Sequence, residues 1–493
     1  MARTSGRTTQ YSLIVTLWIV AGLTTTLQAA HAGVGASSCP TNAIAIAPGT
    51  LIQEAVDRAG ENAVLCLKNG VHRAQAIRPR SGQRFYGEGQ TVLNGSRQLT
   101  DFKRQGDRWT AKLLLPLRRP HGECLPSAPF CNHPEAIFVD DRPLTRVSGR
   151  SQLASYTFYV DGAEGLLYLA DDPTGRKVEM AVAQFAFEST AANVSISNLI
   201  VEKFANAAQK GAIHAREGAR WTIENCEARL NSGAGIGVGS GSRVRNCDIH
   251  ANGQIGIAGH GRDISIEHNH IWSNNIYGFD GTWEAGGAKI ALSDGVRFVD
   301  NYVHDNNGPG LWCDINCRNV LYERNLVEGN HDIGIFHEIS FNAVIRDNVL
   351  RHNGLGDRGW FWGSDIVLAA SEGVDVISNR ITVASGRCGI VLIDQGRRDN
   401  GNRYKTRNNT VLANEMTFED SVCAGGVSDA KPGAENFAII ADGRNLFDRN
   451  TYRMRRPGLD ARFVWGHDVT DWNGFRRRGQ EGSGQLLLSD PTP

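Results

Sequence analysis

Two acidic residues occupy matching positions in two neighbouring segments of the chain. Asp314 follows Gly310 by four residues, and Glu338 follows Gly334 by four residues. If the two segments are adjacent parallel strands, the two carboxyl groups lie on one face about 4.8 Å apart. Retaining glycosidases hold two carboxyl groups ~5–5.5 Å apart, and inverting glycosidases hold them ~6.5–9.5 Å apart. The spacing favours nucleophilic and acid–base chemistry on a glycosidic bond. The alternative is a solvated pair of surface acids, whose mutual repulsion should raise one pKa.

Strand alternation assigns the residues around this pair to two faces. The residues with inward parity, expected in the core, are Leu311, Cys313, Ile315, Ile335, His337 and Ile339. The residues with outward parity are Trp312, Asp314, Phe336 and Glu338. Two aromatic rings therefore flank the two acids on the outer face, and we expect them to stack on a sugar ring.

A repeat in the middle of the chain sets the register of these strands. Six segments begin with an apolar residue, continue with two mostly polar residues and end in Asn or Cys. Their last residues are Cys226, Cys247, Asn269, Asn301, Asn325 and Asn348. The successive spacings are 21, 22, 32, 24 and 23 residues, so one unit carries an insertion. Units of this length, built from turns and short Gly-x-apolar strands, predict a solenoid of β-coils.

The composition agrees with frequent turning. The 493 residues include 56 glycines, about 11% against a usual ~7%. Leucine-rich repeats have a similar length, but their Leu-x-x-Leu-x-Leu pattern is absent. We therefore predict an all-β fold, a right-handed parallel β-helix, with asparagines stacked at one corner. Glycines are expected at corners where the backbone takes positive φ.

The segments around the two acids also resemble a known family. Trp312-Cys-Asp314 and Gly334-Ile-Phe-His-Glu-Ile339 look like the paired motifs of the parallel β-helix β-xylosidases of glycoside hydrolase family 120. The resemblance covers about 28 residues and implies Asp314 as nucleophile and Glu338 as general acid/base. This chain has Cys313 and His337 where that family has apolar residues, so the resemblance leaves the sugar open. The whole chain resembles secreted right-handed β-helix proteins of the pectin-lyase-like superfamily, a fold shared by lyases, epimerases and hydrolases.

Four further residues are expected to bind substrate. Lys289 and Glu284 lie in the insertion that precedes Asp314, and insertions on one face of a solenoid often build its binding site. Lys289 is expected to pair with Asp314 and keep it ionised, while Glu284 binds sugar hydroxyls. His260 holds the corresponding position two coils earlier, and Asp365 is expected at the rim. The alternative for these residues is an ordinary surface ion pair and surface histidine.

The chain is expected to divide into five parts. Residues 1–32 have a basic start, a short apolar run and an Ala-x-Ala end, which predict a secretory signal peptide cleaved near Ala32. Residues 33–98 form a cap and the first coils, with a helix over Thr50–Ala59 that has Thr50 as N-cap. Residues 99–183 form an inserted β-sandwich, residues 184–415 the β-helix, and residues 416–493 β-rich coils and a cap.

Cysteine content and charge indicate the compartment and partners. Ten cysteines, an even number, predict disulfides and a secreted or periplasmic protein. Cys226 and Cys247 share one slot in adjacent coils, where a disulfide or simple stacking fits, and Cys313 and Cys317 favour a local disulfide or buried thiols over a metal site. No metal or cofactor is expected, nor a membrane partner once the signal peptide is removed. Lys+Arg and Asp+Glu both number 52, which argues against a nucleic-acid partner and leaves the oligomeric state open.

Three function classes remain at this point. The first is a retaining glycoside hydrolase on an oligo- or polysaccharide of plant or microbial origin, with a xyloside among the candidate substrates. The second is a polysaccharide lyase or epimerase on a uronate polymer, in which Lys289 and His260 could neutralise the carboxylate and act as base. The third is a carbohydrate-binding solenoid without catalysis. Only the first requires a stacked Asp and Glu.

Overall fold

The computed structural model describes residues 38–114, 118–356, 358–454 and 461–488. The expected signal peptide, residues 1–32, lies outside these residues. No helix among the described residues is long and apolar enough to cross a membrane.

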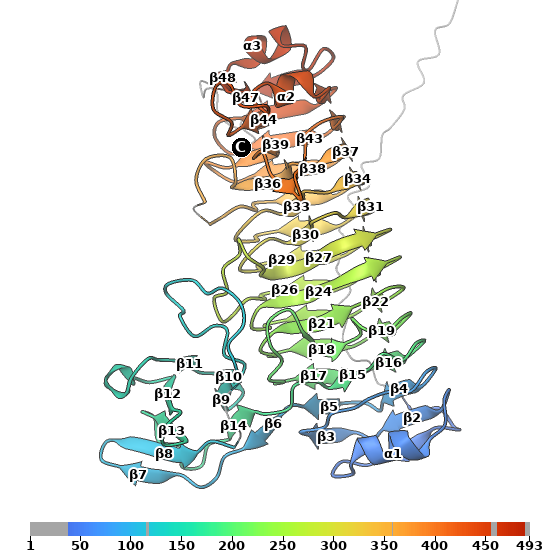
Figure 1. Cartoon of the computed structure of the whole chain (residues 1–493), viewed down its shortest axis with the longest axis vertical. Coiled ribbons are helices and arrows are strands. Elements are labelled where there is room, and N and C mark those ends of the chain that lie inside the picture. The colour runs from blue at the N-terminus through green and yellow to red at the C-terminus, as the bar shows by residue number, and fades with distance from the viewer. Residues whose placement is uncertain (1–37, 115–117, 357, 455–460, 489–493) are drawn as a thin grey trace, which may run out of the picture. The chain divides into compact units, whose positions relative to one another are not determined.

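Successive coils each contribute parallel strands that stack on the strands of the preceding coil (Figure 1). The strands form three rows. The first row contains β15 (Phe187–Glu188), β18 (Gly211–His214), β21 (Ala234–Val238), β24 (Ile255–Arg262), β27 (Gly286–Asp294), β30 (Leu311–Asp314), β33 (Ile335–Glu338), β36 (Ser364–Ala369), β39 (Cys388–Asp394), β44 (Cys423–Ser428) and β47 (Arg462–Gly466). The antiparallel strand β48 (Asp468–Thr470) ends this row.

The other two rows complete the coils. The second row contains β1 (Ile44–Ile46), β2 (Val64–Leu67), β4 (Arg84–Gly87), β16 (Ser195–Ser197), β19 (Thr222–Glu224), β22 (Arg243–Arg245), β25 (Ser265–Glu267), β28 (Arg297–Val299), β31 (Arg318–Glu323), β34 (Phe341–Arg346), β37 (Glu372–Ile377), β42 (Thr410–Leu412) and β45 (Leu446–Asp448). The third row contains β3 (Gly70–Arg73), β5 (Thr91–Asn94), β17 (Ile200–Glu202), β20 (Glu227–Arg229), β23 (Asp248–His250), β26 (His270–Trp272), β29 (Tyr302–His304), β32 (Leu326–Glu328), β35 (Val349–Arg351), β38 (Arg380–Val383), β43 (Glu415–Phe418), β46 (Thr451–Met454) and β49 (Gln485–Leu488). The predicted all-β parallel β-helix is confirmed.

Asparagine side chains stack from coil to coil, as expected, but they do so at two corners where the sequence predicted one. In the first ladder each side-chain amide donates to the carbonyl oxygen of the next side chain at 2.9–3.0 Å. Its members are Asn269, Asn301, Asn325, Asn348, Asn379, Asn414 and Asn450. Buried amides that satisfy one another in this way fix the register of the coils, because a slipped coil would leave them unpaired.

The repeat glycines serve a different purpose from the one expected. The corner before each ladder position has positive φ, but residues such as Asp300 and Arg324 occupy it instead of glycine. Gly310 and Gly334 are instead needed for close backbone approach. A Cβ on Gly310 would lie 2.6 Å from the Gly334 carbonyl oxygen, and one on Gly334 would lie 2.7 Å from that of Asp365. The expectation of positive φ at these glycines was therefore wrong, although the register drawn from them holds.

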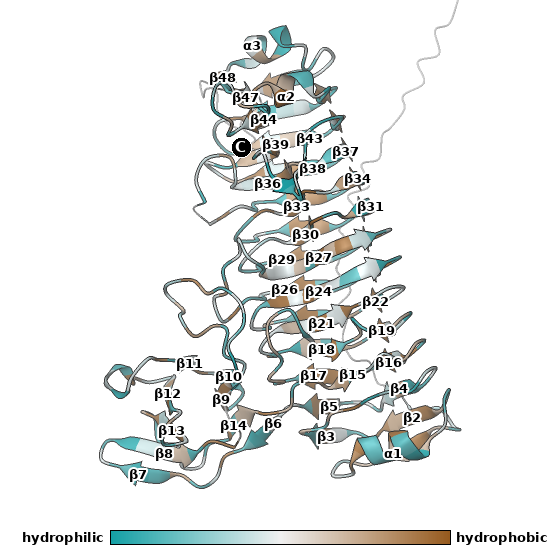
Figure 2. Ribbon diagram, viewed as in Figure 1, coloured by the Kyte–Doolittle hydropathy of each residue, from teal (hydrophilic) through white to brown (hydrophobic). Residues whose placement is uncertain are grey.

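A short helix covers the start of the coils. α1 (Ile52–Arg58) begins two residues later than expected, and its N-cap is Leu51, so the predicted Thr50 cap is wrong. Gln75 supplies the missing acceptor, because its Oε1 accepts from the Ile52 amide at 3.0 Å. The helix carries both apolar and polar residues in Figure 2, and its buried side chains are Ile52, Ala55 and Val56.

Residues between the first coils and β15 form two sheets around their own apolar core, antiparallel except for the parallel pair of β11 and β12. One sheet contains β6 (Ser96–Gln98), β9 (Ile137–Val139), β10 (Arg142–Pro143) and β14 (Val178–Ala181). The other contains β7 (Lys103–Gln105), β8 (Arg108–Lys112), β11 (Thr145–Arg146), β12 (Thr157–Asp161) and β13 (Leu166–Leu169), and a 3₁₀ turn η1 (Arg150–Gln152) precedes β12. A small hairpin, β40 (Arg398–Asp399) and β41 (Asn402–Arg403), follows β39. The last coils add two short helices, α2 (Ile439–Asp442) and α3 (Trp472–Arg477), which the strand-like sequence did not predict.

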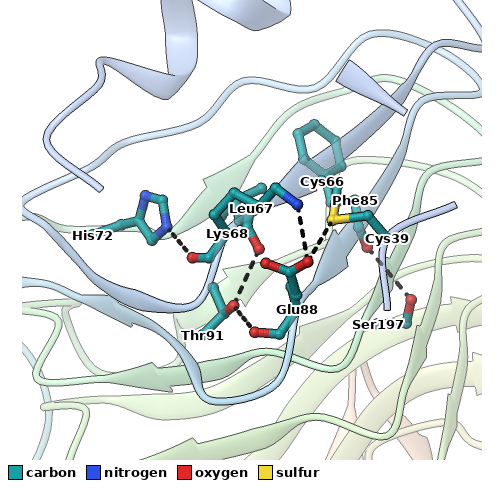
Figure 3. Close-up of a disulfide and its surroundings, with 9 residues drawn as sticks. All are labelled: Cys39, Cys66, Leu67, Lys68, His72, Phe85, Glu88, Thr91 and Ser197. Atoms are coloured by element: carbon teal, nitrogen blue, oxygen red, sulfur yellow. Dashed lines mark hydrogen bonds and ion pairs between the residues drawn. A yellow bond between two sulfur atoms is a disulfide. The ribbon is translucent and has the colours of Figure 1, made fainter. Parts of the chain in front are cut away.

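Six cysteines form three disulfides: Cys39–Cys66, Cys124–Cys131 and Cys388–Cys423. Figure 3 shows the first beside the ion pair of Lys68 and Glu88, whose atoms lie 2.9 Å apart. The other four cysteines, Cys226, Cys247, Cys313 and Cys317, are buried thiols. Of the two alternatives predicted for Cys226 and Cys247, stacking without a disulfide is confirmed. For Cys313 and Cys317, buried thiols are confirmed. Disulfides are typical of proteins that fold in an oxidising compartment.

Candidate active site

Asp314 and Glu338 lie directly opposite each other on adjacent strands. β30 pairs with β33 in parallel register, so that Asp314 faces Glu338 and Trp312 faces Phe336. The predicted pairing of the two acids is therefore confirmed. Their residues are 6% and 8% exposed, so both carboxyl groups are largely removed from solvent. Two carboxyl groups at the ~4.8 Å spacing of neighbouring strands interact strongly in such an environment.

The inner face behaves as predicted within the strands. Leu311, Cys313 and Ile335 belong to the main apolar core. His337 is fully buried, its Nδ1 lies 3.4 Å from the Tyr322 hydroxyl, and burial lowers its pKa to about 3. A neutral core histidine follows, as expected from its parity.

The inward prediction fails just beyond the strand ends. Ile315 follows the last residue of β30, has a φ of 53° and is 39% exposed. Ile339 has a φ of 40° and is buried against Ala370 and Tyr404, outside the main core. Alternation requires extended backbone, and positive φ at both positions ends it.

Lys289 is the cation of the site. Its Nζ lies 2.8 Å from Asp314 Oδ2 and 3.7 Å from Glu284 Oε2, and it donates to the Trp283 carbonyl at 3.0 Å. The expected ion pair between Lys289 and Asp314 is present. The Lys289 side chain is 7% exposed, so this ion pair is screened little by solvent. The other carboxylate oxygen, Oδ1 of Asp314, has no hydrogen-bond partner among the described residues.

Trp312 and Phe336 form a packed wall behind the carboxylates. Lys289 Nζ lies 3.6 Å from the centroid of the Trp312 ring, and the Phe336 ring stacks against Trp312 at 5.1 Å. The rings of Trp362 and Phe336 form a T-shaped pair with their centroids 6.2 Å apart. Neighbouring side chains therefore contact Trp312 on both sides, and both residues are less than 5% exposed. The expected stacking of these rings on a sugar is wrong, because their faces are already used; they hold Lys289 and the strand pair in place.

Glu338 lies in a different environment from Asp314. Burial and the charge of Asp314 raise the pKa of Glu338 to about 7, although Arg397 and Lys289 oppose this rise in pKa. Arg397 Nη1 lies 3.1 Å from Glu338 Oε1. The Trp312 indole N–H is near enough to lower the pKa of Glu338 slightly, but it falls short of hydrogen-bond geometry and has no other partner among the described residues. Asp314 thus has a lysine as its direct partner, while Glu338 is poised to carry a proton near pH 7.

Two residues from the segment after β39 complete the surroundings of the pair. Arg397 is one, and its side chain is 45% exposed. Tyr404 is the other: its hydroxyl donates to Asn316 Oδ1 at 3.1 Å, and burial, together with the charges of Asp399 and Asp314, raises its pKa. Neither residue belongs to the repeat, and each is more than 50 residues from Glu338, so no spacing in the sequence indicated them.

His260 and Glu284 belong to the coils that precede Asp314. His260 pairs with Ala291 on the next strand, and Ala291 pairs with Asp314 on the strand after that. His260 therefore holds the position of Asp314 two coils earlier, as predicted. The hydrogen-bond partner of His260 is Arg216, whose Nε donates to His260 Nδ1 at 2.7 Å. Glu284 Oε2 accepts from Gln209 at 2.8 Å. On the other side of the pair, Ala369 is fully buried.

Asp365 occupies the end of the second asparagine ladder, away from the rim where it was expected. This ladder runs through Asn231, Asn252, Asn274, Asn306, Asn330 and Asn353. Asp365 Oδ1 accepts from the Asn353 side chain at 2.8 Å, and burial raises the pKa of Asp365 to about 7. Its full burial removes it from substrate contact, so the rim assignment is wrong.

No cluster of three or more His, Cys, Asp or Glu side chains within the described ranges has the arrangement of a metal site. The site is made from one carboxylate paired with lysine, one carboxyl group of raised pKa and an aromatic wall. An acid paired with lysine and a neighbouring acid of raised pKa can divide the roles of nucleophile and proton donor.

Comparison with known proteins supports the fold. A family model described as a right-handed β-helix region matches residues 185–282 and 211–381. Together with the observed coils, this match identifies the fold as a right-handed parallel β-helix. No curated protein matches the sequence significantly.

Two solved structures are similar in architecture. One, titled as the complex of XylC with xylose, is 15% identical, covers 91% of this chain and 86% of its own, and has a TM-score of 0.66. The other is the A-module of the Azotobacter vinelandii mannuronan C-5 epimerase AlgE6, 14% identical, covering 89% of this chain and 94% of its own, with a TM-score of 0.50. At these identities the similarity establishes the fold, and the activity has to be argued from the site.

Proposed function

We propose that this protein is a retaining glycoside hydrolase, with Asp314 as nucleophile and Glu338 as general acid/base. The observation that carries this assignment is the pair of stacked carboxyl groups in opposite environments. Lys289 lies 2.8 Å from Asp314, while burial and the Asp314 charge raise the pKa of Glu338 to about 7. The strand spacing matches the separation used by retaining enzymes more closely than the wider separation of inverting enzymes.

The first step needs an anionic nucleophile and a protonated acid. Asp314 attacks the anomeric carbon through its unpartnered Oδ1, and a bond forms between this oxygen and the sugar. The bond from the anomeric carbon to the leaving oxygen breaks as Glu338 transfers its proton to that oxygen. Once Asp314 is esterified its charge is gone, so the pKa of Glu338 falls.

The second step uses that fall in pKa. Glu338, now a carboxylate, accepts a proton from water, whose oxygen attacks the anomeric carbon and releases Asp314. Arg397 supports the anionic form of Glu338 at this stage, because its guanidinium lies 3.1 Å from Oε1. Two displacements on one carbon return the sugar with its original anomeric configuration.

The substrate is proposed to be a neutral oligo- or polysaccharide, with a xyloside as the first candidate. The formal net charge of the chain is zero, which provides no general attraction for a polyanion. The fold neighbour XylC was solved with xylose, and the motif resemblance to the β-helix β-xylosidases favours the same sugar class. Glu284 and His260 are proposed to bind sugar hydroxyl groups.

A lyase or epimerase is a weaker assignment for this site. Such enzymes need a free cation to neutralise the uronate carboxylate, but Lys289 pairs with Asp314 and Arg397 pairs with Glu338. A purely sugar-binding role is also less suitable, since the aromatic faces of Trp312 are covered.

Aryl glycosides and polysaccharides together test this assignment. We expect release of the aryl group from at least one glycoside in a panel that includes β-xyloside and α-arabinoside, and release of reducing sugar without an unsaturated, ultraviolet-absorbing product. Ultraviolet-absorbing products from a uronate polymer would instead support a lyase. Binding of glycans without release of either product would support a carbohydrate-binding solenoid.

Arg397→Met should change the pH dependence of the first step. The Arg397 charge lowers the pKa of Glu338, so its removal raises that pKa. Because Glu338 must be protonated to act as acid, the alkaline limb of the kcat/KM profile, expected near pH 7, should move to higher pH. The measurement is kcat/KM against pH on a substrate with a poor leaving group. Arg398→Met is the matched control, because Arg398 pairs with Glu435 and not with Glu338. An alkaline limb that stays fixed in Arg397→Met would show that Glu338 does not titrate in it.

The protein is proposed to be secreted or periplasmic. Its three disulfides fit an oxidising compartment, and residues 1–32 have the pattern of a secretory signal peptide.

A further inference from the structure

A cavity lies apart from the two acids, where the segment around the Cys124–Cys131 disulfide meets the insertion of one coil. Its volume is about 320 Å³, within the range of small-molecule sites. Two contacts close it against the coil: the Leu125 amide donates to the Gly278 carbonyl at 3.0 Å, and Cys124 bridges to Phe279. Its apolar lining includes Leu125, Phe130, Leu144, Phe158 and Ile276.

One acidic side chain in this cavity, Glu135, has hydrogen-bond partners on only one of its two carboxylate oxygens. Glu135 is 1% exposed, and its Oε1 accepts from the Arg118 amide at 3.0 Å and from Arg118 Nη1 at 3.3 Å. Its second oxygen, Oε2, is enclosed and has no hydrogen-bond partner among the described residues. A buried carboxylate oxygen without a donor is costly, so a ligand hydroxyl able to donate would be favoured beside it.

The same cavity contains an arginine, which has an unpartnered nitrogen. Arg146 lines it, forms no ion pair within the described residues, and has an unpartnered Nη1. Its guanidinium lies 5.3 Å from the centroid of the Phe130 ring. His133 adds no charge at pH 7, because burial and Arg146 lower its pKa to about 4.

The charges of the cavity therefore do not balance. Glu135 pairs with Arg118, and its charge also acts on Arg146, so two guanidinium groups share one carboxylate and one positive charge is left over. Buried charges are normally paired, and guanidinium groups bind carboxylates in a planar, bidentate way. An unpaired arginine, a carboxylate oxygen lacking a donor and an apolar wall describe a ligand with one carboxylate, hydroxyl groups and an apolar face.

We propose that this cavity binds a sugar carboxylate of the size of one uronic acid unit, with its carboxylate on Arg146 and a hydroxyl on Glu135. The apolar wall of Phe130 and Leu144 contacts the C–H face of the sugar. This site is separate from the proposed active site, since Asp314, Glu338 and Lys289 do not line it. It does not depend on the hydrolase assignment.

Isothermal titration calorimetry on the full chain tests this site. D-glucuronate and D-galacturonate should bind at least about tenfold more tightly than D-glucose, D-galactose or acetate, because only the uronates supply both the carboxylate and the hydroxyl. Arg146→Met should weaken uronate binding by about tenfold or more. Arg142→Met is the matched control, because Arg142 lies on the neighbouring strand over Tyr156 and does not line the cavity. It should bind as the unchanged protein does.

Two further variants make the result decisive. Ser127→Trp places a bulky ring at an exposed position in the cavity lining, and it should block binding even if Arg146→Met fails to fold. Asp314→Asn should leave uronate binding intact. Absence of uronate binding to the unchanged protein would overturn the proposal. Uronate binding that survives Arg146→Met or Ser127→Trp would also overturn it, as would binding lost in Asp314→Asn.

Discussion

Asp314→Asn is expected to reduce kcat by about 10⁴-fold or more, which corresponds to ~5.5 kcal/mol in the barrier. The amide has nearly the shape of the carboxylate but cannot form the glycosyl ester, so the first displacement is lost. The change also leaves Lys289 without its 2.8 Å partner, although Glu284 remains 3.7 Å away. Activity is measured with an aryl glycoside, and thermal unfolding is measured in parallel.

Glu323→Gln is a matched control for this loss. Glu323 lies in the neighbouring β31, is also largely buried and pairs with Arg346 and Arg324, but it is not in the site. We expect it to keep full activity at a similar cost in stability. Azide should restore turnover in Asp314→Ala and give a product of inverted configuration, because only one displacement remains. Full activity in Asp314→Asn would exclude Asp314 as nucleophile.

Glu338→Gln should show a loss that depends on the leaving group. Without a proton donor, kcat/KM for an unactivated glycoside should fall by ~10²–10⁴-fold. The fall should be much smaller for a dinitrophenyl glycoside, whose leaving group needs no proton. The alkaline limb near pH 7 should also disappear, because the group whose pKa is raised to about 7 is gone. Kinetics on both substrates across the pH range measure these effects.

The contrast between the two acids is the strongest check on their roles. With Glu338→Ala, azide should accelerate release of the sugar and give a product of retained configuration, the opposite of Asp314→Ala. Glu328→Gln is a control in the same coil, since Glu328 accepts from the Tyr302 hydroxyl in the third row. Equal losses on activated and unactivated substrates in Glu338→Gln would contradict its role as acid.

The register of the two acids could be predicted because it depends on local chemistry that repeats. The glycines of neighbouring coils align, strands alternate strictly between them, and Asp314 and Glu338 are counted from the same position. Two predictions about the backbone failed: Ile315 has a positive φ and leaves the core, and Gly310 and Gly334 do not have the positive φ expected of them. The stacking of neighbouring coils determines where φ is positive, and the sequence of one segment does not show this. The stacked asparagines were predictable for the same reason as the register.

The roles of individual side chains were harder to predict where they depend on neighbours from other parts of the chain. Trp312 has outward parity, but Lys289 and Phe336 cover its faces, so it cannot serve as a sugar platform. Asp365 has the chemistry of a rim residue, yet it ends a ladder of asparagines. Arg397 and Tyr404 come from a non-repeating segment after β39, and only the folded structure brings them to the acids.

The configuration of the sugar first released by the unchanged protein tests the central claim most directly. Proton NMR, recorded before mutarotation, identifies that anomer on any glycoside that the protein cleaves. Double displacement through Asp314 predicts the same configuration as the substrate. Release of the opposite anomer would contradict a covalent role for Asp314 and the assignment of this pair.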